Sequence, residues 1–244
     1  MLQRLVLSSD EVLIWGEPYD HCDFTRRLAD PLKAFTDDWP PESFIAATAK
    51  LESGEALSAQ WVASLYPNPP QLLRAQRAFF ETLYAEPAAA AGYSRWGFKE
   101  VRLSLDYAIY LKWLFPDARF LFLVRNPYDA YRSYRIFRNW YDRWPKDRVL
   151  TPAHFGRVWR SLADGFVSDH EKVGGLLIKY EDLVGGQLPI KKIADYLELN
   201  LSDDALGKRV SGRGKVQLRE VPSFERRHLA REVEPLASRL GYSP

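Results

Sequence analysis

An unbroken apolar run at residues 120–124, followed at once by Arg125, constrains this chain more than any other feature. The run is too short for a helix and rich in aromatic and branched side chains, which predicts a strand buried on both faces, as in a parallel sheet. Asn126 can cap a helix, Pro127 suits its first position, and Asp129 lies where a carboxylate favours the helix dipole. We therefore predict a strand, a tight turn and a helix, with a guanidinium at the end of the strand.

This guanidinium is a candidate anion-binding group, because open α/β sheets bind ligands at the carboxyl ends of their strands. Ser133 lies about two helical turns into the predicted helix, on roughly the face of Pro127, and near enough to share an anion with Arg125. A buried strand followed by a basic surface helix is the alternative interpretation. The segment 119–148 favours the anion site, since it carries eight Lys or Arg residues against three Asp residues.

The overall composition is that of an ordinary globular protein. The 244 residues include 34 basic and 32 acidic side chains, a net charge of +2. This is not the strong excess of basic residues that is typical of a nucleic-acid binder. A single cysteine, Cys22, excludes an intrachain disulfide and fits a reducing compartment, so we expect a cytoplasmic protein. No apolar run has membrane-spanning length and no signal-peptide pattern opens the chain. Cys22 and the four histidines have no metal-ligand spacing, so we expect no metal site.

Strand and helix patterns alternate along the chain. Strands are predicted at 11–15, 96–101, 120–124 and 175–180. Besides the helix that begins at Pro127, helices are predicted at 2–7, 24–35, 42–51, 55–65, 71–91, 103–115, 152–173, 188–199 and 223–240, with an aromatic and basic loop at 140–148 and a glycine-rich basic loop at 211–215. This alternation predicts an α/β fold with a mostly parallel sheet flanked by helices. No repeat or linker interrupts it, and we interpret residues 1–244 as a single domain.

Polar side chains stand at the ends of all four predicted strands. They are Glu17, Lys99 with Glu100, Arg125, and Tyr180 with Glu181. If the strands are parallel, these groups gather at one edge of the sheet. A carboxylate, a lysine, an arginine and a tyrosine there could bind an anionic donor and deprotonate an acceptor.

This constellation resembles the sulfotransferase family, which uses 3′-phosphoadenosine 5′-phosphosulfate as donor. Residues 125–133 look like the family's 3′-phosphate-binding motif, in which an Arg at a strand end and a Ser eight residues later hold the phosphate; the resemblance implies these roles for Arg125 and Ser133. The segment 179–183 is similar to the family's Tyr-Glu-Asp segment, whose tyrosine lies by the adenine. The resemblance therefore implies that role for Tyr180.

The resemblance also implies catalytic residues. Lys99 stands where the family carries a lysine that contacts the sulfuryl group, and Glu17 resembles the glutamate that serves tyrosylprotein and related sulfotransferases as general base. A looser match to a late basic loop implies that Arg213, Gly214 and Lys215 close over the 3′-phosphate. The resemblance covers most of the chain from about residue 11 onward, although residues 24–95 match only in general layout.

The sequence departs from the family pattern in two ways. Cytosolic members carry a catalytic histidine two residues after the lysine; here that residue is Val101, which leaves Glu17 as the base. The family also opens with a strand and a glycine-rich loop for the 5′-phosphosulfate, and no such loop pattern occurs in this sequence. We expect a P-loop-NTPase-like sulfotransferase architecture that lacks this first strand, with residues 2–7 as the helix that normally follows the loop. A shortened or mis-started reading frame is the leading explanation, and a degenerate protein is the second.

The implied function is transfer of a sulfuryl group from 3′-phosphoadenosine 5′-phosphosulfate to a hydroxyl of a small molecule or glycan, without a metal. Glu17 would take the hydroxyl proton, and Lys99 would offset the charge on the transferring group. One alternative is a non-catalytic relative that binds adenosine 3′,5′-bisphosphate or a partner, because the 5′ loop is absent. Another, a nucleotide kinase, is weakened by the lack of both a phosphate loop and metal-holding carboxylates.

Each candidate residue also has a plainer interpretation. Glu17 could be a solvated turn residue, Lys99 could pair with a surface carboxylate, and Tyr180 could be a core aromatic at a strand end. Ser133 could be a neutral serine on a helix surface, and the loop at 212–215 could be a flexible turn.

Overall fold

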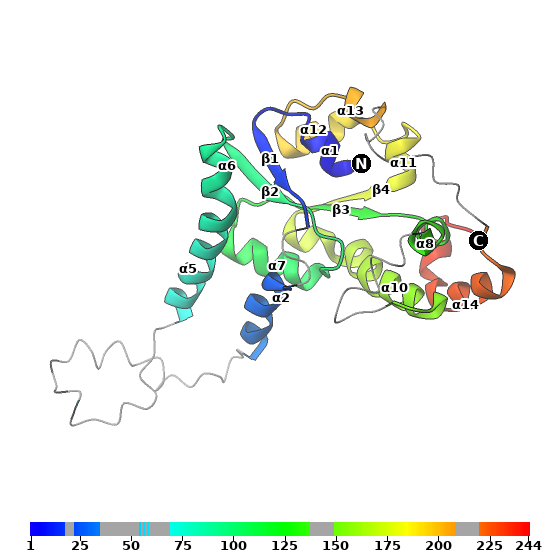
Figure 1. Ribbon diagram of the computed structural model, residues 1–244, viewed down its shortest axis with the longest axis horizontal. Helices are drawn as coiled ribbons and strands as arrows, with labels where there is room; N and C mark the ends of the chain where they lie inside the picture. Colours follow the sequence, from blue (N-terminus) through cyan, green and yellow to red (C-terminus); the bar gives the residue numbers. More distant parts are fainter. Residues whose placement is uncertain are drawn as a thin grey trace.

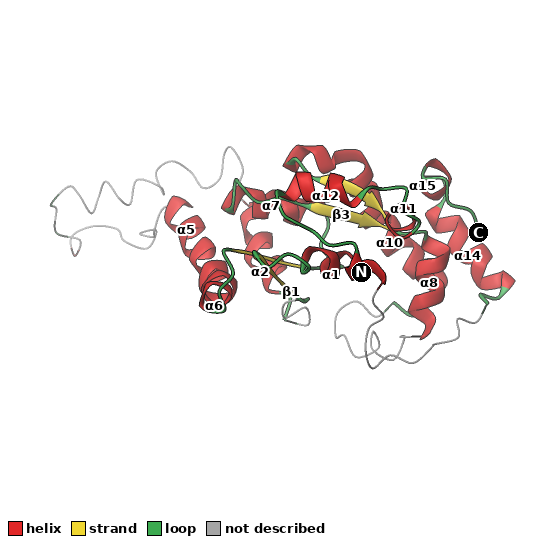
Figure 2. Cartoon of the chain, turned by 90° about the horizontal axis from the view of Figure 1, so that it is seen from above, coloured by secondary structure: helices red, strands yellow, loops and turns green. Residues whose placement is uncertain are grey.

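The computed structural model describes residues 1–17, 22–34, 54, 56, 58, 69–136, 149–207 and 220–244. Figures 1 and 2 show the chain in two views at right angles, with α5 and α6 at one end of the strands and α8 with α14 at the other. The elements in chain order are α1 (Leu2–Val6), β1 (Val12–Trp15), α2 (Phe24–Ala29), the 3₁₀ helix η1 (Asp30–Ala34), α5 (Pro69–Phe80), the π-helix η3 (Glu81–Ala85), α6 (Glu86–Ala90), β2 (Arg95–Phe98), α7 (Leu105–Leu114), β3 (Leu121–Val124), α8 (Pro127–Ile136), α10 (Pro152–Asp169), the 3₁₀ helix η4 (His170–Val173), β4 (Leu176–Lys179), α11 (Tyr180–Val184), α12 (Ile190–Leu197), α13 (Asp204–Gly207), α14 (Ser223–Val233) and α15 (Leu236–Arg239).

The four strands form two parallel pairs. β1 pairs with β2, so that Trp15 lies opposite Phe98, and β3 pairs with β4, so that Val124 lies opposite Lys179. The predicted α/β class, with parallel strands flanked by helices, is confirmed. In the part of the chain that the structure describes, β2 and β3 do not pair with each other, and the sheet is divided into two halves.

One shared layer of helices covers both halves on the same face. Leu5 of α1 and Ile193 of α12 are fully buried, and they belong to one apolar cluster with Val12 of β1 and Ile178 of β4. Figure 1 shows α1 and α12 together beside the strands. Because alternate residues of a strand point to opposite faces, the intervening strand residues must be covered from the other side.

The opposite face is covered by different helices over each half. Phe80 of α5 and Tyr84 of η3 pack with Tyr107 of α7 against Trp96 and other residues of the β1–β2 pair. Over the second pair, Phe122 packs with Leu105 of α7, while Val124 joins a cluster with α8, α10 and α14. The strands therefore lie between two layers of helices.

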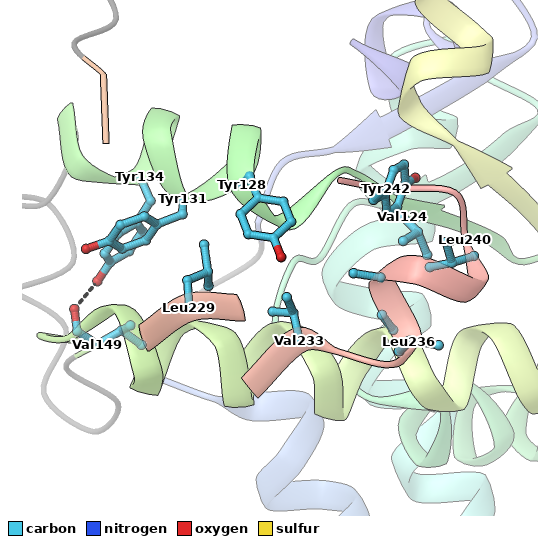
Figure 3. Packing of buried hydrophobic residues seen from close by; sticks show 12 residues of the cluster. Val124, Tyr128, Tyr131, Tyr134, Val149, Leu229, Val233, Leu236, Leu240 and Tyr242 are labelled. Carbon is cyan, nitrogen blue, oxygen red and sulfur yellow. Dashed lines mark hydrogen bonds between the residues drawn. The ribbon is translucent and has the colours of Figure 1, made fainter. Parts of the chain in front are cut away.

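The segment from β3 into α8 is a strand, a turn and a helix, as predicted. Burial of the strand on both faces is wrong, because Phe122 and Val124 are buried but Leu123, on the other face, is 37% exposed. Pro127 is the first residue of α8, and the Asn126 side-chain oxygen accepts a hydrogen bond from the Tyr128 amide at 2.9 Å, which confirms the predicted cap. Tyr128, Tyr131 and Tyr134 belong to one buried cluster with Leu229 and Val233 of α14, and Figure 3 shows the Tyr134 hydroxyl directed at the Val149 carbonyl.

Several predicted boundaries differ from the structure. The helix predicted at 223–240 is two helices, because Pro235 has no amide hydrogen and its ring blocks the turn before it. The strand predicted at 175–180 ends at Lys179, and Tyr180 opens α11, a short helix with acidic residues in its first turn. The helix predicted at 42–51 and the loops at 140–148 and 211–215 lie outside the described residues, as does almost all of 55–65. The single domain stays a prediction.

The shared helix layer yields a stability prediction. Ile178 is 1% exposed, so Ile178→Ala leaves a cavity between the strands and α12 and should lower the free energy of unfolding by about 2–5 kcal/mol. Ile109→Ala removes the same atoms from a side chain that is 44% exposed and should change it by about 0.5 kcal/mol or less. Urea unfolding of the two variants measures the difference, and equal midpoints would contradict this account of the core.

Candidate active site

The ends of β1 and β2 bring two predicted catalytic residues into contact. The Lys99 amide donates to the Trp15 carbonyl at 3.0 Å, which continues the parallel ladder to the end of β2. Beyond it, the Lys99 ammonium forms an ion pair with a Glu17 carboxylate oxygen. The two side chains are 39% and 26% exposed, so this pair lies at the surface, where a ligand from solution can reach it.

Glu100 adds a second carboxylate to the same edge. Its side chain folds back and accepts hydrogen bonds from the Val101 amide at 2.7 Å and the Arg102 amide at 3.3 Å. Burial raises the pKa of the Glu100 carboxyl, and the negative charge of Glu17 acts in the same direction, while the two amides and Arg102 oppose the rise. The sequence identifies Glu100 only as one of several polar residues at strand ends. Its back-folded conformation could not be predicted from the neighbouring residues.

The ends of β3 and β4 bring Arg125 and Tyr180 together. The Arg125 guanidinium carbon lies 4.7 Å from the centre of the Tyr180 ring, a cation–π contact. The Arg125 Nε atom is buried and has no hydrogen-bond partner among the described residues. Leaving a buried donor without an acceptor is costly, so this nitrogen fits an anionic ligand that would supply the acceptor.

The backbone around Arg125 is held from two other elements. Trp159 on α10 donates its indole N–H to the Arg125 carbonyl at 2.9 Å. Glu181 on α11 accepts the Asn126 amide at 2.9 Å. The sequence predicts neither contact, although Glu181 lies in the segment 179–183 that resembles the Tyr-Glu-Asp segment. The turn that bears the guanidinium is thus fixed by its neighbours.

Ser133 lies on α8, half-buried, and its role as a phosphate ligand stays a prediction. At roughly 100° per residue it is about 120° around the helix from Pro127, so placing the two on one face is wrong. The buried side of α8 is formed by Pro127, Tyr128, Tyr131 and Tyr134. No hydrogen bond joins Ser133 to Arg125 in the structure as described.

The remaining predicted donor contacts, Arg213, Gly214 and Lys215, lie outside the described residues and stay predictions. Within the described ranges, no group of three or more His, Cys, Asp or Glu side chains is arranged to hold a metal ion. No helix of those ranges is long and apolar enough to cross a membrane.

Comparisons with known proteins give a family and a similar fold. A family profile described as "Sulfotransferase family" matches residues 6–203. Among solved structures, the sulfotransferase domain from the curacin biosynthetic pathway is similar, with a TM-score of 0.51 and 14% identity over 99% of this chain and 93% of that one. At this identity the likeness shows the fold alone. No curated protein sequence matches this chain.

The raised pKa of Glu100 predicts a pH effect on stability. A carboxyl whose pKa is higher in the folded state than in the unfolded state costs stability as the pH rises above the ordinary Glu value of about 4.3. Glu100→Gln removes this cost. The melting temperature of the variant relative to the unaltered protein should therefore increase from pH 4 to pH 7.

Glu198→Gln is the matched control, because the pKa of Glu198 is lowered by its hydrogen bond and ion pair with Arg119. Its stabilising charge is lost on substitution, so the melting temperature relative to the unaltered protein should fall over the same pH range. Parallel pH profiles for all three proteins would contradict the desolvation of Glu100.

Proposed function

Because the chain belongs to the sulfotransferase family, we propose that it transfers a sulfuryl group from 3′-phosphoadenosine 5′-phosphosulfate to a hydroxyl of a small molecule or glycan. The observation that carries the proposal is the Arg125 guanidinium, which lies over the Tyr180 ring with a buried nitrogen that has no acceptor in the described chain. An arginine in this state is suited to a phosphate, which its planar fork can bind through two parallel hydrogen bonds.

In this proposal the β3–β4 end of the sheet binds the nucleotide half of the donor. Arg125 holds the 3′-phosphate, and Ser133 contributes a hydroxyl from α8. Tyr180 lies against the adenine. Arg213, Gly214 and Lys215 would complete the phosphate contacts. In this proposal the chemical step uses no metal ion.

The β1–β2 end performs the transfer. The acceptor oxygen attacks the sulfur in line, the bond from sulfur to the leaving phosphate oxygen breaks, and the hydroxyl proton passes to the Glu17 carboxylate. Lys99 offsets the negative charge that gathers on the sulfuryl group and the leaving oxygen. The products are the sulfated acceptor and adenosine 3′,5′-bisphosphate. The ion pair between Glu17 and Lys99 supports these roles, because it places the base next to the group that would hold the electrophile.

Nucleotide binding can be tested without knowing the acceptor. Adenosine 3′,5′-bisphosphate at 100 times its dissociation constant should add about 2.7 kcal/mol to the free energy of unfolding, a clear rise in melting temperature. Arg125→Ala should weaken binding by roughly 10- to 100-fold, because hydrogen bonds to a charged group are lost, and should remove about half of that rise or more.

Arg157→Ala is the control for this measurement, since Arg157 is 54% exposed in its side chain and pairs with Glu232 on α14. It should bind the nucleotide as the unaltered protein does. A melting curve that millimolar nucleotide leaves unchanged, or an equal rise in the Arg125 variant, would reject this donor site.

The base assignment predicts a separation of binding from turnover. Glu17→Gln should reduce transfer of labelled sulfuryl from the donor to a panel of alcohols, phenols and sugars by roughly 10²- to 10⁴-fold, because the amide cannot accept the proton. Its affinity for adenosine 3′,5′-bisphosphate should stay the same. Glu11→Gln, just before the opposite end of β1, should keep both properties. Full activity of the Glu17 variant would exclude Glu17 as the base.

A further inference from the structure

The segment after α15 returns to the ends of β3 and β4. Tyr242 is 7% exposed and packs in the core cluster that includes Val124 and Leu240, as Figure 3 shows. Its hydroxyl donates to a Glu181 carboxylate oxygen at 2.9 Å. The Lys179 ammonium donates to the Leu240 carbonyl at 2.7 Å, so the last residue of β4 also holds this segment. The end of the chain is therefore part of the surroundings of the proposed donor site.

Glu181 connects this segment to the residue that follows Arg125. One of its oxygens accepts the Tyr242 hydroxyl, and the other accepts the Asn126 amide at 2.9 Å. Asn126 in turn caps α8 through the Tyr128 amide. A single carboxylate thus joins the C-terminal segment, the turn after β3 and the start of α8.

The hydrogen bond from the Asn126 amide to Glu181 holds the backbone turn from which the Arg125 side chain projects. Within the described chain, the guanidinium makes no hydrogen bond and has the Tyr180 ring as its contact. Its direction therefore depends on the backbone turn at 125–126 and on the place of Tyr180. Glu181 is the acceptor for the turn, so a shift of its carboxylate would move the backbone from which the guanidinium projects.

The chemistry of the Tyr242 hydroxyl suits a fixed support. Burial raises the pKa of Tyr242, and the negative charges of Glu181 and Asp182 raise it further. The hydroxyl therefore keeps its proton near neutral pH and remains a donor to the Glu181 carboxylate. A hydrogen bond with a charged acceptor is stronger and shorter than one between neutral groups, which favours a single position for Glu181.

We infer that Tyr242 and Glu181 are positioning residues that aim Arg125 at the 3′-phosphate of the donor. The inference rests on the proposed function, because it assumes that Arg125 binds this phosphate. A residue that merely stabilises the fold would change the melting temperature but would not alter the preference between nucleotides with and without a 3′-phosphate. That preference is the property that separates the two roles.

The test compares two nucleotides by titration calorimetry of the full chain. Tyr242→Phe keeps the buried ring and removes the hydroxyl. It should weaken binding of adenosine 3′,5′-bisphosphate about tenfold, a size reasonable for a lost hydrogen bond to a charged group. Adenosine 5′-monophosphate, which lacks the 3′-phosphate, should bind within about twofold of its original affinity. Glu181→Gln, which leaves one carbonyl oxygen for two donors, should give the same selective loss.

Tyr110→Phe is the matched control. Tyr110 is also buried and its hydroxyl donates to Gln76 at 3.0 Å, but it lies in the cluster over β1 and β2. Its removal should leave the ratio of the two affinities unchanged.

Equal weakening of both nucleotides by Tyr242→Phe and Glu181→Gln, or no weakening of either, would overturn the positioning role. A failure of the donor site itself is visible separately, in the unaltered protein. If that protein does not prefer the nucleotide with the 3′-phosphate, the proposed function is wrong and the inference falls with it.

Discussion

Parallel strand pairing is the constraint on which the candidate site depends. A parallel ladder places the carboxyl ends of its strands side by side, and residues that are far apart in the chain meet there. Pairing of β1 with β2 brings Glu17 to Lys99, and pairing of β3 with β4 brings Arg125 to Tyr180. The shared helix layer of α1 and α12 then holds the two pairs in one structure.

The sequence predicts the features whose causes are local. The apolar run before Arg125 indicates a strand, and Asn126 with Pro127 indicates the start of α8, because capping and proline geometry act within a few residues. Burial of that strand on both faces is predicted wrongly at Leu123, because burial depends on which distant segments cover the strand. The contacts that join distant segments could not be predicted. Nothing near Glu181 in the chain indicates that Tyr242 donates to it, and the back-folded side chain of Glu100 depends on the turn around it. The predicted shared face of Ser133 and Pro127 is wrong, because six residues at about 100° each leave the two about 120° apart around α8.

The contact between Glu17 and Lys99 shapes the chemistry that this edge can perform. In the structure the Lys99 ammonium and the Glu17 carboxylate form an ion pair with each other. In the proposed reaction, a sulfuryl group that approaches Lys99 would compete with Glu17 for the same positive charge, and an acceptor hydroxyl would reach the carboxylate as that ion pair opens. The proposed reaction therefore couples the arrival of the donor to the release of the base, through one interaction between two side chains.

The division of the sheet has a consequence for the protein in solution. In the described part of the chain, each of the four strands has one ladder partner, so each has a second side whose backbone amide and carbonyl groups no described strand pairs. An unpaired strand edge is a template on which another polypeptide can add hydrogen bonds.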